Sequence, residues 1–123
     1  MPQKTLLLVD DDRDFLDGLT APLARRGYRV LSATSAPEGL EVAKREKPDL
    51  FVLDVQMGEM DGYALCAALK QADATFDTPV IFLSGMSEAG DMLRGYYAGA
   101  HDYMTKPVDL DELFRKIAKL IGA

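Results

Sequence analysis

Four short apolar runs in this chain each end at a charged or hydroxyl-bearing side chain. They are LLLV at 6–9, LFVL at 50–53, VIFL at 80–83 and a short run through Tyr103 and Met104. The first three contain no polar alternation, which is typical of strands covered on both faces in a parallel sheet. The polar residues that follow the runs are Asp10, Asp11, Asp12, Asp54, Ser84 and Lys106. Because ligands bind beyond the carboxyl ends of parallel strands, we expect these groups to converge on one site.

Amphipathic stretches separate the apolar runs along the whole chain. We expect strands at 5–9, 29–33, 49–53, 79–83 and 101–104, and helices at 13–26, 36–46, 62–72, 87–98 and 109–121. Five strand–helix units predict an α/β fold, with a five-stranded parallel sheet and helices on both faces. No linker or repeat interrupts the pattern, so we expect a single domain over 1–123. Pro22 inside the first helix predicts a kink or a helix in two pieces, because proline removes a backbone hydrogen bond.

Composition argues against several classes of protein. The single cysteine, Cys66, lies in the helical stretch YALCAALK, where we expect a small buried side chain in a reducing compartment. No apolar run approaches the ~18 residues that a membrane helix needs, which favours a cytoplasmic protein with no membrane partner. A net charge of −6 with no basic stripe argues against direct nucleic-acid binding by this chain.

The acidic residues at the strand ends have two interpretations. Asp10–Asp12 alone would be an ordinary helix start, with acids near the positive end of the helix dipole, and we expect Asp12 to have only this capping role. Asp54 changes the balance, because it ends a different strand and its carboxylate would repel those of Asp10 and Asp11 if the two strands are neighbours. A hard cation removes that repulsion. Mg²⁺ suits carboxylates combined with a backbone carbonyl, waters and a phosphoryl oxygen.

Lys106 and Ser84 add groups that a metal site alone does not require. A lysine beside a carboxylate–metal cluster is useful if a phosphoryl group is there to receive it. The simpler interpretation is a salt bridge from Lys106 to Asp10 or Asp54, and both can hold in turn. Ser84 offers a hydroxyl to a phosphoryl oxygen, although serine is also common at strand ends and turns.

The motifs LLLVDDD, LFVLDVQMGEMDG, VIFLSG and GAHDYMTKP together resemble the receiver domain of bacterial two-component response regulators, over about residues 5–121. The resemblance implies the flavodoxin-like strand order 2-1-3-4-5. It also implies a cis peptide bond before Pro107. The site residues it implies are Asp54 as phosphoacceptor, Asp10, Asp11, Asp54 and the Gln56 carbonyl around Mg²⁺, Ser84 and Lys106 at the phosphoryl group, and Tyr103 with Ser84 as a switch.

The function implied is a phosphorylation-dependent switch in a phosphorelay. A sensor histidine kinase or histidine phosphotransfer protein would donate a phosphoryl group to Asp54, and the surface of the expected helix 87–98, last strand and last helix would change for a downstream protein or a fused output domain. The chain would not be an enzyme in the usual sense, although its site should support its own phosphorylation and dephosphorylation.

Three alternatives remain open. An aspartate-nucleophile phosphatase would have a DxD pattern that begins at its nucleophile. This chain instead has Gln56 two residues after Asp54. A flavin-binding module on the same fold needs a phosphate loop after the first strand, where acids here would repel phosphate. A receiver-like interaction module that is never phosphorylated would normally have lost part of the site. The chain also differs from the family pattern at Gly58, usually proline, and at His101, usually an acid in receivers that dimerise through this face.

Overall fold

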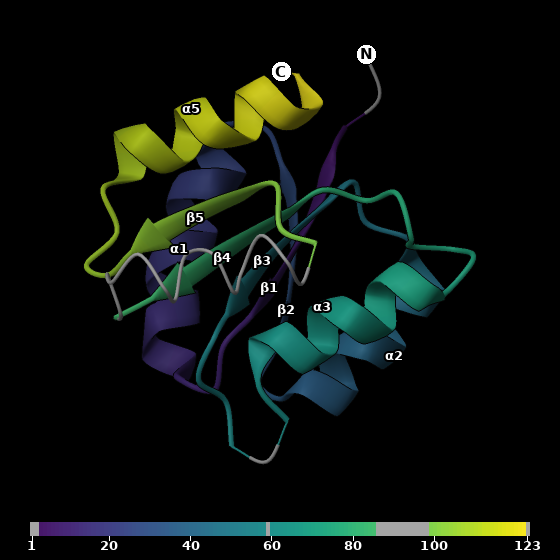
Figure 1. Cartoon of the computed structure of the whole chain (residues 1–123). Helices are drawn as coiled ribbons and strands as arrows, with labels where there is room; N and C mark the ends of the chain where they lie inside the picture. Colours follow the sequence, from purple (N-terminus) through teal and green to yellow (C-terminus); the bar gives the residue numbers. More distant parts are fainter. Residues whose placement is uncertain (1–2, 59, 86–98, 123) are drawn as a thin grey trace.

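The computed structural model describes residues 3–58, 60–85 and 99–122 and contains one five-stranded parallel sheet, in the order β2-β1-β3-β4-β5 (Figure 1). The strands are β1 (Thr5–Val9), β2 (Arg29–Ala33), β3 (Leu50–Asp54), β4 (Val80–Ser84) and β5 (Asp102–Thr105). The helices are α1 (Arg13–Arg25), α2 (Ala36–Glu46), α3 (Gly62–Gln71) and α5 (Leu110–Ile121). The expected helix 87–98 lies outside the described residues. The predicted fold class and strand order are therefore confirmed.

Two hydrophobic cores lie on the two faces of the sheet, because successive side chains of a strand point to opposite faces. On one face Leu7, Phe51 and Phe82 of the strands pack with Leu65 and Leu69 of α3, and α2 covers the same face. In the other core, strand residues pack against α1 and α5, and its members include Leu6, Leu8, Val52, Ile81, Leu16, Leu19, Leu23, Leu113 and Ile117. All residues of β1, β3 and β4 are buried, which explains why these runs lack polar alternation.

Helix starts agree with the capping residues in the sequence. Asp12 accepts a hydrogen bond from the backbone N–H of Phe15, Asp61 from Ala64, and Asp109 from Glu112. Such caps satisfy backbone donors that a helix start otherwise leaves without partners. The first two caps begin α1 and α3 soon after β1 and β3 end. They leave short loops at the carboxyl edge of the sheet, where the acidic residues lie.

Helix α1 continues through Pro22 as one element, so of the two expectations at this proline the helix in two pieces is wrong, and the kink stays a prediction. The proline lies in the last turn, so the one backbone hydrogen bond that it removes is near the C-terminal end of the helix. Leu16, Leu19 and Leu23 bury the same face of α1 on either side of it and keep the helix on the sheet.

Two further sequence expectations concern Cys66 and the membrane. Cys66 is a free, buried cysteine on α3, and burial raises the pKa of its thiol to about 11. It therefore packs as a small apolar side chain, as expected. In the described part of the chain, no helix combines the length and the apolar content that a membrane crossing requires.

Candidate functional site

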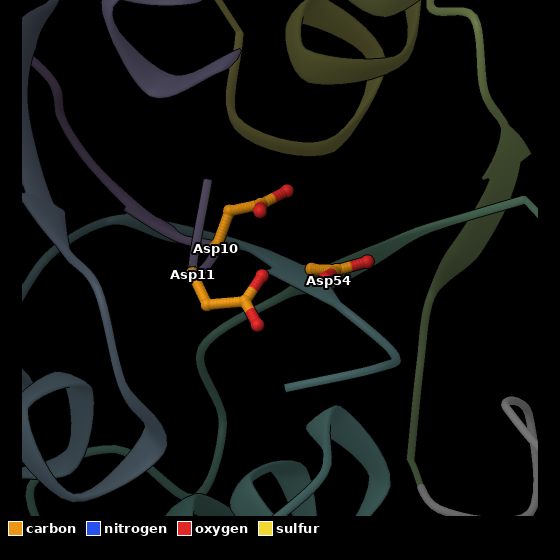
Figure 2. Close-up of side chains that lie close together, drawn as sticks. All are labelled: Asp10, Asp11 and Asp54. Atoms are coloured by element: carbon orange, nitrogen blue, oxygen red, sulfur yellow. The ribbon is translucent and has the colours of Figure 1, made fainter. Parts of the chain in front are cut away.

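Three carboxylates meet at the carboxyl edge of the sheet (Figure 2). Asp10 and Asp11 follow β1, Asp54 ends β3, and the two strands are paired neighbours with Val9 opposite Leu53. One oxygen from each carboxylate lies within 4.8 Å of the others, and Asp10 and Asp54 are buried whereas Asp11 is exposed. The expected convergence of the acidic residues is thus seen.

Backbone contacts hold the chain around the two buried carboxylates. The N–H of Asp10 donates to the carbonyl of Ala33 at 3.1 Å, and Asp10 Oδ1 accepts from the N–H of Asp12 at 2.9 Å. Behind Asp54, the N–H of Gly62 donates to the carbonyl of Val55 at 2.8 Å. A Cβ atom at Gly62 would collide with the carbonyl oxygen of Asp54. The start of α3 can approach the site this closely because residue 62 is glycine.

Lys106 bridges the two buried carboxylates. Its Nζ lies 2.9 Å from Asp10 Oδ2 and 3.4 Å from Asp54 Oδ1, so both salt bridges considered from the sequence form at once. The backbone N–H of Lys106 donates to the carbonyl of Ser84 at 2.7 Å, and the Lys106-Pro107 bond is cis, as expected. The ring of Phe15 on α1 lies 4.3 Å from the same Nζ atom.

The electrostatics of the site favour an additional cation. Burial, and then the charge of Asp10, raise the pKa of Asp54 above its ordinary value, although Lys106 opposes this. Burial alone would lower the pKa of Lys106, but its hydrogen bond to Asp10 and the charges of Asp54 and Asp10 together raise it. One ammonium therefore contacts two desolvated carboxylates, and the exposed carboxylate of Asp11 lies beside them. Hard carboxylate oxygens with surplus negative charge are a donor set that fits Mg²⁺.

The other predicted site residues lie around this cluster. Ser84 is buried at the end of β4, and Tyr103 on β5 is buried with its ring 6.4 Å from that of Phe82. Gln56 is exposed in the loop after β3, and the metal role of its carbonyl stays a prediction. In the same loop Gly58 has φ of +56°, which proline cannot adopt, so the loop here takes a path closed to the usual family residue.

Sequence reasoning missed two residues of the site, Phe15 and Gly62. Phe15 lies in the first turn of α1, just past the Asp12 cap, and its ring contacts the Nζ of Lys106. An aromatic residue one turn after an acidic strand end was the available signal. Gly62 was read as part of a helix start, and its contact with Asp54 depends on the packing of α3 against β3.

Comparison with known proteins gives the same family throughout. The family model of the response regulator receiver domain matches residues 6–118. The transcriptional regulatory protein YvrH of Bacillus subtilis is 40% identical over 118 residues, which are 95% of this chain and 48% of that protein. The chain thus spans about half the length of this relative.

Solved structures agree with the sequence relatives. The signal receiver domain of a signal transduction histidine kinase from Syntrophus aciditrophicus superposes with a TM-score of 0.87 at 33% identity, over 96% of this chain and 89% of that one. The chemotaxis protein CheY4 of Vibrio cholerae has the same fold, with a TM-score of 0.92 at 24% identity over 97% of this chain and 99% of that one. By its family match and its relatives, this chain belongs to the response regulator receiver domains of two-component systems.

Proposed function

We propose that the chain is a phosphorylation switch in which Asp54 accepts a phosphoryl group and Lys106 and Ser84 hold it. The observation that carries the proposal is the ammonium of Lys106, 2.9 Å from one buried carboxylate and 3.4 Å from a second. A plain salt bridge needs one partner, whereas this ammonium also lies close to an oxygen of Asp54, the proposed phosphoacceptor. Its backbone tie to Ser84 brings the serine hydroxyl to the same edge of the sheet.

The transfer step uses the Asp54 carboxylate as nucleophile. Its oxygen forms a bond to phosphorus while the N–P bond of a donor phosphohistidine breaks, and the electron pair of that bond returns to the imidazole nitrogen. Burial strips water from the Asp54 oxygens, and Lys106 offsets negative charge on the transferred group. Dephosphorylation uses water, which attacks the phosphorus of the acyl phosphate, releases inorganic phosphate and restores the carboxylate. The site would therefore support its own phosphorylation and dephosphorylation without being an enzyme for a separate substrate.

Asp10, Asp11 and Asp54, with the Gln56 carbonyl, would hold Mg²⁺, which when bound offsets negative charge on both the carboxylate and the incoming phosphoryl group. Two properties of these residues support the assignment. Asp10 is fixed by its contacts with Asp12 and Lys106, so it can orient ligands at low entropic cost. Asp11 is exposed and can take up a cation from solvent.

The donor that this site fits is a sensor histidine kinase or a histidine phosphotransfer protein, acting in the cytoplasm. The receiver domain would span 1–123. Relatives such as YvrH are about twice as long as this chain, and YvrH is named a transcriptional regulator, so we propose a fused output domain or a separate downstream protein as the second partner. The net charge of −6 disfavours direct nucleic-acid contact by this chain itself.

We also propose Ser84 and Tyr103 as the route of readout. Movement of Ser84 toward a phosphoryl group on Asp54 would shift the end of β5, because the Ser84 carbonyl accepts from the N–H of Lys106. Tyr103 lies on that strand, packed edge-on near Phe82. The surface expected to change is that of β5, α5 and the helix expected at 87–98.

The proposal is tested by intact mass after incubation with acetyl phosphate. With Mg²⁺ the protein should gain the mass of one phosphoryl group as acetate is released, and EDTA should prevent it. Asp54→Asn should abolish the gain. Asp12→Asn is the matched control, since asparagine keeps the helix cap and Asp12 lies outside the carboxylate cluster. A mass gain that persists in Asp54→Asn, or that forms equally well in EDTA, would contradict the proposal.

A further inference from the structure

Phe15 links the carboxylate site to the surface of α1. Its ring centroid lies 4.3 Å from the Nζ of Lys106, on the first turn of the helix. Its backbone N–H donates to Asp12 Oδ1 at 3.2 Å, so the helix cap fixes the position from which the ring projects. The ring also lines an apolar groove of about 580 Å³ together with Leu19, Val108 and Leu110.

Lys106 needs such a partner because its side chain is long, flexible and partly exposed. Hydrogen bonding to Ser84 fixes its backbone, but the four-carbon stem has many rotamers and the side chain is 28% exposed. Of its two carboxylates, Asp10 is nearer and more deeply buried than Asp54. Without a further contact, we expect the ammonium to pair with Asp10 alone or to be solvated by water. A ring within about 6 Å of the ammonium attracts it by the ring's quadrupole.

We propose that Phe15 is a positioning residue for Lys106, whose ring holds the ammonium between Asp10 and Asp54 where it can reach a phosphoryl group. The inference rests on the proposed function, since it concerns how the lysine serves Asp54. A leucine at residue 15 would fill the same apolar space but has no quadrupole. The role of Phe15 therefore differs from simple packing in a testable way.

A second contact of the same kind supplies the control. The guanidinium of Arg26, just past the end of α1, lies 4.0 Å from the ring centroid of Phe114 on α5, outside the carboxylate cluster. Phe114→Leu removes an aromatic–cation contact of similar geometry. It should leave Lys106 where it is.

The first measurement needs neither metal nor donor. Ring current should shift the Hε protons of Lys106 upfield in the NMR spectrum of the wild-type protein. The shift should vanish in Phe15→Leu and persist in Phe15→Tyr and Phe114→Leu. An unchanged Lys106 Hε shift in Phe15→Leu overturns the inference, because the ring then does not hold the ammonium in solution.

The second measurement is the rate of phosphorylation by acetyl phosphate with Mg²⁺. Phe15→Leu should be slower by roughly threefold to tenfold, Phe15→Tyr should restore the rate to within about twofold, and Phe114→Leu should match wild type. Should Phe15→Leu melt below the assay temperature, Phe15→Met takes its place. If the wild-type protein is phosphorylated and Phe15→Leu is phosphorylated at the same rate, the inference is overturned and the proposed function stands. A wild-type protein that takes no phosphoryl group overturns both.

Discussion

Lys106 and Lys116 each contact two carboxylates, and the two clusters differ chiefly in burial. Lys106 Nζ lies 2.9 and 3.4 Å from its partners, and Lys116 Nζ lies 2.9 and 3.9 Å from its own. The site cluster is Asp10, Asp54 and Lys106, and the surface cluster is Asp102, Glu112 and Lys116. The carboxylates are 3% and 8% exposed in the site cluster but 21% and 46% exposed in the surface cluster.

The two clusters have the same type of ion pair, so burial is what distinguishes the candidate site from an ordinary surface ion pair. Water screens the surface cluster, so its ion pairs change the free energy of unfolding little. In the site cluster the carboxylates have lost much of their hydration, and Asp11 adds further negative charge beside them. The ionised carboxylates of the site therefore lower the stability of the fold, and a bound cation or a change of charge at Asp54 should alter the free energy of unfolding strongly.

Loss of either lysine should separate the two clusters most clearly. Lys106→Met keeps the apolar stem but leaves Asp10 and Asp54 repelling each other, and we expect the free energy of unfolding to fall by about 2–3 kcal/mol, less than for a fully buried pair. Lys116→Met should cost roughly 0–1 kcal/mol. Urea denaturation without divalent cations measures both. Equal losses in the two variants would show that burial does not distinguish the clusters.

Much of this site could be predicted because strand ends are local features of the sequence. Each acidic or basic residue follows an apolar run, and a parallel sheet brings those ends together whatever the helices do in detail. Asp10, Asp54 and Lys106 were found in this way. The expected strand at 49–53 is one residue early at both ends, since β3 begins at Leu50 and its pairing continues to Asp54, which lies opposite Leu83.

Contacts between elements could not be predicted in the same way. The approach of Phe15 to Lys106 depends on how α1 lies across the sheet and on the direction of one ring. The contact of Gly62 with the Asp54 carbonyl depends on the distance between α3 and β3. The continuity of α1 through Pro22 reflects packing of three leucines that outweighs a local preference. Such features need the tertiary arrangement.

Removal of charge from Asp54 should stabilise the protein without metal. The folded-state pKa of Asp54 is raised by burial and by Asp10, so its ionisation penalty is absent below the ordinary value of 3.8 and complete above the folded pKa. Asp54→Asn should therefore raise the free energy of unfolding at neutral pH by roughly 1 kcal/mol, and less in acid.

The matched variant lies in the surface cluster. Asp102 accepts from Lys116 and from the N–H of Tyr103, so Asp102→Asn should be neutral or slightly destabilising at every pH. Urea denaturation at several pH values, with EDTA present, compares the two variants. If Asp54→Asn destabilises the protein at neutral pH, the ionised carboxylate of Asp54 does not lower the stability of the fold. Burial then does not distinguish the site cluster from the surface cluster.

The smallest expected effect concerns His101, next to the surface cluster. Through this residue acid should lower the free energy of unfolding, which is opposite to its effect through Asp54. Its Nδ1 accepts from the N–H of Val80 at 3.3 Å, and burial, then the charge of Lys70, lower its pKa. The stabilisation by neutral His101 is complete above its ordinary value of 6.5 and is lost as pH falls through the folded pKa. Acid thus weakens this region while it relieves Asp54. Because the imidazole is exposed, the loss should stay below about 0.5 kcal/mol. Urea denaturation near pH 7.5 and roughly pH 5.5 should show this loss of unfolding free energy in wild type and in Asp54→Asn. The loss should be absent in His101→Gln. Its persistence in His101→Gln would assign it to another group.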